Sequence, residues 1–345
     1  MTELPKRQTF HLAENFERQI SKLLSDYGLR ISDSRKIAEC VKRLSDFFID
    51  NPLGETPWKE SWAQIAYISY FAPLNFLRNQ AVVAEAKQRN FFHGLETLTD
   101  FGAGLGSAAW AINEQHSFKK TTLIEKAEAC RNLQTKFLSE LNFSQQATVK
   151  SDPPQKALCS FSYSLTELKA LPKWALQFEA LMIVEPSTRD DGRKLGDIRN
   201  QLIQAGYSII APCTHQKACP LLTQSKTDWC HDRIHIELPE WMQDVEKNLP
   251  FKNQTLTMSY LLARKKDSFK TQDLSNFARL VGDALVENGK TRQLHCRGEN
   301  REFIAWMHRH FPKYPGLDRG ILLNISELAL EEKGLELRVK KSSET

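Results

Sequence analysis

The chain has 345 residues, of which 41% are hydrophobic and 26% are charged, values that suit a globular protein with a sizeable core. No apolar run approaches the roughly 18 residues that a membrane-spanning helix needs, and Met1 to Glu14 contains no apolar core of a secretory signal. We therefore expect a soluble protein of the cytoplasm, or of an organelle matrix in a eukaryotic host, with no membrane partner. In that reducing compartment its seven cysteines are expected as metal ligands or inert core thiols rather than as disulfides.

The first ninety residues are predicted to form a helical region. Apolar positions recur at helical spacing in residues 16–24 and 37–48, and again in the longer stretch 58–86, where Pro73 is expected to interrupt the helix. Residues 1–90 are therefore interpreted as an N-terminal helical cap.

From residue 95 the pattern changes to short apolar runs that alternate with helical stretches. The runs cover residues 95–101, 121–125, 157–163, 178–185 and 207–212. Strands alternating with helices predict a parallel, doubly wound α/β sheet, and residues 255–263 are expected to add a final antiparallel strand. The predicted α/β domain spans residues 91–267.

A glycine-rich segment, DFGAGLGS at residues 100–107, follows one expected strand directly and precedes a helical run. Glycines allow the backbone to turn tightly and to approach a ligand, while the start of the next helix offers free N–H groups. Ser107 stands where a dinucleotide-binding loop has its third glycine. The spacing instead resembles the first motif of class I S-adenosylmethionine-dependent methyltransferases, although glycines that serve only a structural turn remain the alternative.

The resemblance of this loop implies a cofactor site of six residues: Asp100, Gly102, Gly104, Gly106, Glu125 and Asp152. By that resemblance the first acid and the glycines hold the methionine part of the cofactor. Glu125, which ends the next expected strand, accepts hydrogen bonds from the ribose, and Asp152 lies near the adenine.

Three cysteines with the spacing C-x5-C-x10-C fall in one loop, residues 211–231, after the fifth expected strand: Cys213, Cys219 and Cys230. Soft thiolates favour zinc or iron–sulfur over hard cations. The paired C-x2-C knuckles typical of zinc ribbons are absent, and three thiolates leave a four-cysteine cluster one ligand short. Cys296 is the predicted fourth ligand, because it follows an apolar strand and lies among charged turn residues.

An iron–sulfur centre is favoured, with zinc as the alternative. A metal bound by Cys296 and the distant loop would pin the C-terminal part onto the α/β domain, and such a site can supply on the order of 10 kcal/mol toward closing so long a loop. His215 and His231 are alternative ligands, and the other interpretation is that they support the ligands or bind RNA. Cys40, Cys130 and Cys159 have no neighbouring thiols in the sequence and are interpreted as inert.

The C-terminal segment, residues 268–345, is predicted to be β-rich, with candidate strands at 277–286, 291–296 and 302–307. It also carries most of the chain's net charge of +5, because residues 290–320 contain seven Lys or Arg against three acids. The candidate RNA-binding residues are Arg292, Arg297, Arg301, Arg309 and Lys313. The alternative is that this basic stretch is only a solvated face.

The cysteine segment and the sequences around it resemble the Rsm22, or methyltransferase-like-seventeen, family of small-ribosomal-subunit proteins. The resemblance is carried by IVEP at 183–186, IIAPCTH at 209–215, CPL at 219–221, DWCH at 228–231, SY at 259–260 and Cys296, within residues 75–306. Asp232 replaces an aromatic residue that the family has after DWCH. The resemblance implies a class I methyltransferase fold, a four-cysteine [4Fe–4S] centre, and binding to immature small-subunit ribosomal RNA.

The sequence leaves catalysis open and identifies no catalytic residue. The Asn/Asp-Pro-Pro-Tyr type motif of base-nitrogen methyltransferases is absent from the matching segment SFSYS at 160–164, where Tyr163 could stack on a base or serve the core. The leading hypothesis is a cofactor- and metal-containing assembly factor that binds ribosomal RNA. An active ribosomal RNA methyltransferase and a zinc-stapled interaction protein are the two alternatives.

Overall fold

The computed structural model describes residues 8–51, 54–149, 153–168, 170–250, 252–312, 314 and 316–340. Two of the predicted site residues, Asp152 and Lys313, lie outside this part of the chain. The chain divides into two compact units. The glycine-loop unit comprises Thr9–Glu185 and Ile234–Leu256, and the cysteine unit comprises the described residues of Pro186–Arg233 and Thr257–Thr345. No helix in the described ranges is long and apolar enough to cross a membrane.

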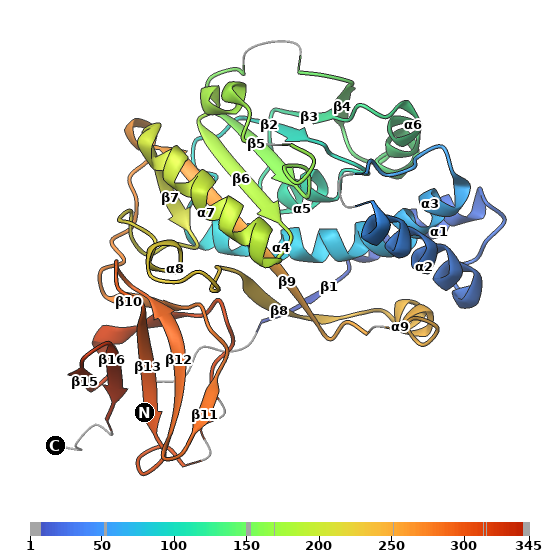
Figure 1. The fold of residues 1–345 in the computed structure, drawn as a ribbon. Coiled ribbons are helices and arrows are strands. Elements are labelled where there is room, and N and C mark those ends of the chain that lie inside the picture. The colour runs from blue at the N-terminus through green and yellow to red at the C-terminus, as the bar shows by residue number, and fades with distance from the viewer. Residues whose placement is uncertain are drawn as a thin grey trace. The chain divides into compact units, whose positions relative to one another are not determined.

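The glycine-loop unit is built on parallel strands in the order β4-β3-β2-β5-β6 (Figure 1). Their bounds are β2 Thr97–Phe101, β3 Lys120–Ile124, β4 Phe143–Gln146, β5 Ala157–Ser162 and β6 Ala180–Glu185. Parallel strands are covered on both faces, which explains why β6 is buried at every position and is visible in the sequence as an apolar run. The strand that precedes the glycine loop, β2, has β3 on one side and β5 on the other. This reversal of strand order is the point where doubly wound proteins bind ligands at the carboxyl ends of their strands.

Helices of the N-terminal region pack onto the helices that connect the strands. These helices are α1 Glu14–Ser25, α2 Ser34–Asp50, α3 Ser61–Ala66, α4 Ala72–Gln88, α5 Ser107–Gln115 and α6 Glu128–Phe137. An aromatic cluster joins four of them: the ring of Phe16 lies 4.3 Å from Phe76, 4.9 Å from Trp110 and 5.1 Å from Phe137. These four side chains are almost fully buried, so α1 and α4 are part of the core of the α/β fold.

The expected interruption at Pro73 is wrong, because the chain stays helical on both sides of it. A π-helical turn, Tyr67–Phe71, follows α3, and Pro73 lies in the first turn of α4. Proline is tolerated at that position, since its missing N–H is one that a helix start leaves unpaired.

Three short elements of this unit were not predicted: β1 Thr9–His11, β8 Asp232–Glu237 and α9 Glu240–Glu246. β1 pairs with β8 in parallel. Glu246 of α9 accepts a 2.8 Å hydrogen bond from the buried hydroxyl of Tyr70, which fastens α9 to the π-helical turn.

The first part of the cysteine unit contains α7 Arg189–Gln204, β7 Tyr207–Ala211 and a short helix α8 Pro220–Thr223. β7 pairs with β9 Thr255–Lys265, and the pair is antiparallel as the sequence predicted. Thr188 caps the start of α7 by accepting a 3.2 Å hydrogen bond from the backbone N–H of Asp191. The cysteine loop therefore begins at the carboxyl end of β7.

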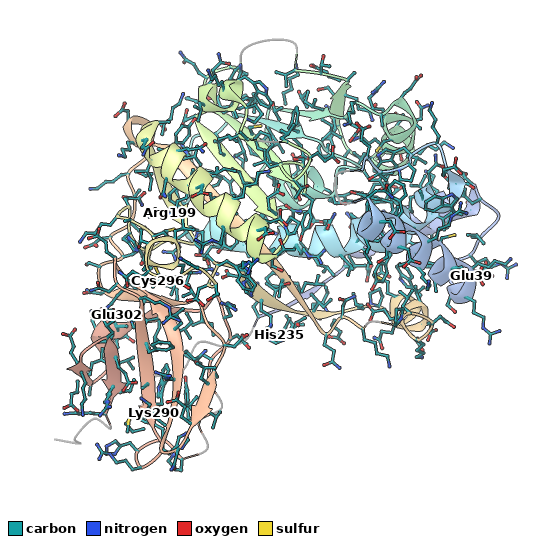
Figure 2. All side chains as sticks on the ribbon, viewed as in Figure 1. Glu39, Arg199, His235, Lys290, Cys296 and Glu302 are labelled. Atoms are coloured by element: carbon teal, nitrogen blue, oxygen red, sulfur yellow. The ribbon has the colours of Figure 1, made fainter. Side chains whose placement is uncertain are left out.

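The second part is a mainly antiparallel sheet in the order β14-β10-β12-β13-β16-β15, with β11 also paired to β12. The bounds are β10 Phe277–Leu280, β11 Leu285–Glu287, β12 Lys290–Cys296, β13 Glu302–Met307, β14 Leu322–Asn324, β15 Leu330–Lys333 and β16 Glu336–Val339. The single strand expected at 277–286 is divided into β10 and β11. The division falls near Gly282, where a Cβ would lie only 2.7 Å from the Cβ of Leu294. Lys290 and Cys296 mark the two ends of β12 (Figure 2).

Candidate metal centre and cofactor loop

The glycine loop at the carboxyl end of β2 is tightly packed against the chain's own side chains. Gly102 has a φ of +64°, and a Cβ there would lie 2.5 Å from the Cβ of Ser164. Gly104 has a φ of +52°, and its Cβ would lie 3.0 Å from the hydroxyl of Tyr67. Glycine is therefore required at both positions, for the left-handed backbone and for the close approach of a neighbouring side chain.

Two predicted cofactor residues shape this loop. Glu125 accepts a 3.1 Å hydrogen bond from the N–H of Gly104 and a 2.9 Å bond from that of Ala127. Asp100 accepts a 3.3 Å bond from Ala109 and is 1% exposed. Burial raises the pKa of Glu125, and it raises that of Asp100 to about 7. A carboxylate oxygen has room for a second hydrogen bond, so both acids keep the capacity to bind a polar ligand.

The residues around the loop fit the methionine end of S-adenosylmethionine. The loop and its left-handed glycines lie at the reversal of strand order, where a ligand is expected. The buried Oγ atom of Ser164 has no hydrogen-bond partner among the described residues. A buried polar atom of this kind usually has a partner in the working protein, and a bound cofactor with polar groups would provide one.

Tyr163, at the carboxyl end of β5, adopts an unusual backbone conformation. Its φ is +58°, which is rare for a bulky residue. Its side chain is half-buried, and the guanidinium of Arg78 lies 5.4 Å from the ring centre. Such strain clusters at functional sites, and this is the position where base-nitrogen methyltransferases carry their motif.

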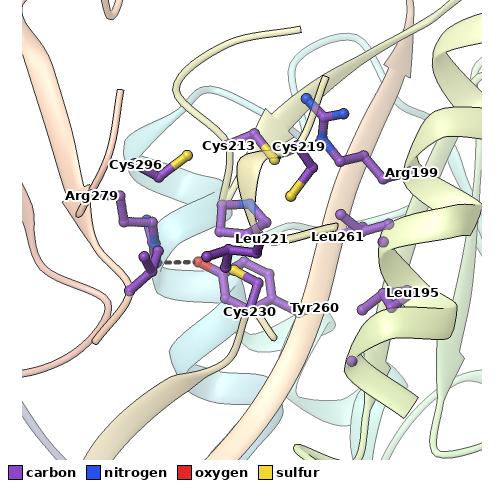
Figure 3. A pocket seen from close by; sticks show the side chains of 14 residues that line it. Leu195, Arg199, Cys213, Cys219, Leu221, Cys230, Tyr260, Leu261, Arg279 and Cys296 are labelled. Atoms are coloured by element: carbon purple, nitrogen blue, oxygen red, sulfur yellow. Dashed lines mark hydrogen bonds between the residues drawn. The ribbon is translucent and has the colours of Figure 1, made fainter. Parts of the chain in front are cut away.

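All four cysteines that the sequence predicted as ligands line one pocket in the cysteine unit (Figure 3). Cys213 lies just after β7, Cys219 precedes α8, Cys230 precedes β8, and Cys296 ends β12. The last three also pack against an apolar cluster of Leu221, Val281 and Leu294. The structure thus brings Cys296 to the pocket that the three loop cysteines line.

The four thiols line the pocket at which the metal centre was predicted. Within the ranges that the structure describes, no group of three or more His, Cys, Asp or Glu side chains is arranged to hold a single metal ion. Burial raises the pKa values of Cys219, Cys230 and Cys296. These thiols are therefore protonated at neutral pH in the free chain, and a bound metal would have to displace their protons.

One face of α7 lines this pocket, and it was not predicted from the sequence. The face consists of Gly192, Leu195, Gly196 and Arg199, spaced i, i+3, i+4 and i+7. A Cβ on Gly192 would lie 2.7 Å from the ring of Trp229, and one on Gly196 would lie 2.9 Å from Leu222. The two glycines therefore allow the cysteine loop to lie directly on the helix, and their spacing was the signal that could have revealed this.

Two arginines of α7 bind the cysteine loop. Arg193 donates from Nη1 to three loop carbonyls, those of Leu221 (3.2 Å), Ser225 (3.1 Å) and Asp228 (3.0 Å). Arg199 donates from Nη2 to the carbonyls of His215 (2.9 Å) and Lys217 (2.8 Å), and from Nε to the sulfur of Cys213 (3.1 Å). Neither arginine was a predicted site residue, because each looks like an ordinary charged position of a helix.

The two alternative histidine ligands have other contacts. His215 Nε2 lies 3.4 Å from the sulfur of Cys296, and His231 Nε2 lies 2.9 Å from Nη1 of Arg319. Burial lowers the pKa of each histidine to about 4. Both imidazoles are therefore neutral near pH 7, and His215 is the one beside a predicted ligand.

Asp232, which departs from the family's aromatic residue, belongs to a buried polar group beside the pocket. Its carboxylate pairs with the guanidinium of Arg279, which also donates a 2.6 Å hydrogen bond to the hydroxyl of Tyr260. Arg279 and Tyr260 line the pocket, and Figure 3 shows the bond between them. Asp232 thus has a structural role, because it pairs with Arg279, which lines the pocket.

The predicted RNA-binding arginines are mostly engaged in ion pairs within the chain. Arg292 pairs with Glu287 at 2.7 Å, Arg301 with Asp228 at 2.7 Å, and Arg297 with both Glu302 at 2.8 Å and Glu332 at 3.0 Å. Arg309 donates to the ring of His310. The charge excess of the segment is therefore partly neutralised by acids, and three of these acids lie outside residues 290–320.

The parallel strand order, the glycine loop at its switch point and the buried acid after β3 define a class I methyltransferase-like protein. The sequence matches the family model described as mitochondrial small ribosomal subunit Rsm22 over residues 61–303, which is well over half of the chain. The chain belongs to this family, and the resemblance drawn from its motifs is confirmed.

Several solved structures similar to this chain carry the name of a methyltransferase. They include PH1948 from Pyrococcus horikoshii, assigned as an RNA methyltransferase (12% identity, covering 55% of this chain and 84% of that one, TM-score 0.36). Others are TrmK of M. capricolum with S-adenosyl-homocysteine (9%, 55% and 71%, 0.32) and a S-adenosylmethionine-dependent methyltransferase from Thiobacillus denitrificans (10%, 55% and 91%, 0.31). At this level of similarity they add nothing to what the strand order shows. The comparison with curated proteins finds no match.

Proposed function

We propose that the chain is an S-adenosylmethionine-binding, iron–sulfur-containing factor that acts in small-ribosomal-subunit assembly by binding ribosomal RNA. The observation that carries the proposal is the gathering of four cysteines, three from one loop and Cys296 from β12, around one pocket. Four cysteines that serve only as inert core residues are not expected to gather around one pocket. The family's description, which names the mitochondrial small ribosomal subunit, supports the ribosomal part.

An iron–sulfur cluster suits this pocket better than zinc. A single zinc ion bound by four thiolates at about 2.3 Å holds the sulfurs roughly 3.8 Å apart. A cluster of four irons lies between its four cysteines and keeps them farther apart. The four thiols line one pocket, and no group of three ligand side chains among the described residues could hold one metal ion, so we propose the second arrangement, with Cys213, Cys219, Cys230 and Cys296 as the ligands. Zinc remains the alternative that the metal analysis must exclude.

The cofactor proposal depends on the glycine loop. Asp100, Gly102, Gly104 and Gly106 would hold the methionine part, and Glu125 the ribose. Bound S-adenosylmethionine supplies an electrophilic methyl group. The fold, the left-handed glycines and the unpartnered Oγ of Ser164 support this proposal. In a eukaryotic host the factor would work in the organelle matrix, and in a bacterium it would work in the cytoplasm.

An active ribosomal RNA methyltransferase is the second candidate, favoured by one observation. Tyr163 has a left-handed backbone conformation, which is unfavourable for a tyrosine, and it lies at the carboxyl end of β5, where a target base would enter. Incubation of small-subunit assembly intermediates with methyl-labelled cofactor separates the two candidates. Label on the RNA, lost with Gly104→Val, would establish catalysis. If the chain binds RNA and the cofactor but transfers no label to the RNA, the assembly factor is the candidate that remains.

The metal centre is tested by anaerobic purification of the full chain with quantification of iron, sulfide and zinc. We expect about four irons and four sulfides per chain, and loss of most of the iron in Cys296→Ser. Cys40→Ser is the matched control, because Cys40 is a half-buried thiol of the other unit. A colourless protein with one zinc and no iron would support the zinc-stapled alternative, and equal iron in both variants would remove Cys296 from the centre.

A further inference from the structure

A single arginine of α7 lies among the predicted metal ligands with no acidic partner. Arg199 is 2% exposed and lines the cysteine pocket. Its guanidinium donates four hydrogen bonds, to the sulfur of Cys213, the carbonyls of His215 and Lys217, and the side-chain oxygen of Asn200. Across the part of the chain that the structure describes, it forms no ion pair with Asp or Glu. The hydrogen bonds that Arg193 of the same helix makes to this loop all go to backbone carbonyls and not to sulfur.

A buried guanidinium without a negative partner is energetically unfavourable, because it has lost its hydration and gained only neutral dipoles. Arginine cannot relieve this cost by losing its proton. The structure therefore needs a negative charge next to Arg199, and the ionisable groups that line the same pocket include the four cysteine thiols. Four thiolates around an iron–sulfur cluster would supply that charge.

We infer that Arg199 is a positioning residue of the metal centre, which donates a charged hydrogen bond to the Cys213 sulfur and raises the reduction potential of the cluster. The inference rests on the proposed iron–sulfur centre. A cation and an N–H···S bond stabilise the reduced cluster, which carries one more negative charge than the oxidised one, and so favour uptake of the electron. The two carbonyl bonds of the same guanidinium fix the loop, so that the sulfur is presented at one place.

Lysine could not replace this arginine fully. A planar guanidinium makes several bonds in fixed directions, while an ammonium is a flexible point charge. Arg199→Lys would thus retain the charge but lose the bond geometry, and Arg199→Gln would lose both. Arg193→Gln is the matched control, since it removes bonds to the same loop without removing a contact to sulfur.

The test uses the anaerobically purified full chain and measures two quantities in the parent and the three variants. One is the midpoint potential of the cluster, from a redox titration followed by electron paramagnetic resonance. The other is the rate at which a chelator removes iron. We expect Arg199→Gln to show a more negative midpoint potential and iron loss about 10–100-fold faster than the parent, with Arg199→Lys in between. Arg193→Gln should lose iron faster while its potential stays at the parent value.

The outcomes separate this inference from the proposed function. A parent chain without iron would overturn the centre and the inference together. A parent with iron whose potential is unchanged in both Arg199 variants would overturn the inference alone. If Arg199→Gln does not fold, as judged by circular dichroism, the potential of Arg199→Lys decides the matter, because loss of the bond to sulfur must shift it.

Discussion

Replacing Gly102 by alanine tests whether the cofactor loop is packed as closely as the structure shows. The new Cβ would lie 2.5 Å from the Cβ of Ser164, a separation that real side chains do not tolerate. The backbone φ of +64° is also unfavourable for alanine. The substitution therefore carries two costs, one of conformation and one of crowding.

The magnitude follows from adding these costs. A left-handed conformation costs a non-glycine residue about 1–2 kcal/mol, and crowding in a well-packed region costs about 1–3 kcal/mol. Gly102→Ala should therefore lower the free energy of unfolding by about 2–5 kcal/mol. Gly28→Ala is the matched control: its φ is +67°, but no atom of the described residues lies within 4 Å of its Cβ position, so only the conformational cost of about 1–2 kcal/mol remains.

The assay is urea unfolding of the full chain, with a double-mutant cycle between Gly102→Ala and Ser164→Gly. Removing the Ser164 side chain makes room for the new methyl group, so the pair should show a favourable coupling of about 1–3 kcal/mol, equal to the relieved crowding. Equal destabilisation by Gly102→Ala and Gly28→Ala would refute the reasoning, and so would strictly additive effects in the cycle.

Three further predictions concern pH, the pocket wall and RNA. Burial raises the pKa of Asp100 to about 7, against about 3.9 in an unfolded chain, so the folded state alone keeps this proton and stability falls as pH rises from about 4 to about 7. Asp100→Asn should flatten that part of the curve in urea unfolding at several pH values, and an unchanged slope would contradict it. Arg279→Met leaves the buried Asp232 unpaired and should cost about 3–5 kcal/mol of unfolding free energy; adding Asp232→Leu should recover most of the loss. Glu332→Gln frees Arg297 from a partner that is 70% exposed, and filter binding at several salt concentrations should show tighter RNA binding with a steeper salt dependence, whereas weaker binding would argue against this arginine as an RNA contact.

The strands that build the α/β fold could be predicted because burial on both faces makes them apolar throughout. β5 and β6 are visible in the sequence for this reason. β4 was missed, because its sequence FSQQ is polar and every residue in it is half-buried. A strand of this kind is fixed by pairing with β3, and such pairing leaves no periodic signal.

The candidate site was predictable only where its residue types are chemically distinctive. Thiols and glycines stand out in a sequence, and all four predicted cysteines lie at one pocket. The supporting face of α7 did not stand out, because Gly192, Gly196 and Arg199 form no apolar stripe. Their roles come from close approach and from bonds to the loop, neither of which a hydrophobic pattern reports.

The count of charges in residues 290–320 predicted the basic face less well than the cysteines and glycines predicted the candidate site. The count of seven Lys or Arg against three acids leaves Arg297 and Arg301 only Glu299 and Glu302 as nearby acids in the sequence. In the folded chain Glu332 and Asp228 reach them from other segments. Ion pairs join residues through space, so a local charge excess overstates the positive potential that RNA would meet.

From the sequence we expected a metal to hold the C-terminal part to the cysteine loop. In the structure apolar contacts within the cysteine unit also join these two parts. Leu221 of the loop already packs with Val281 and Leu294 of the β-rich part, and burying three such side chains contributes roughly 5–9 kcal/mol. Gln224 adds hydrogen bonds to Glu299 (2.7 Å) and Arg301 (3.0 Å). Because this sum is comparable with the order of 10 kcal/mol that a metal site supplies, the loop and the sheet should stay together without metal. Chelated protein should therefore resist proteolysis within the loop between Cys213 and Cys230 almost as well as metal-loaded protein, while Leu221→Ala should make that loop protease-sensitive once the metal is removed.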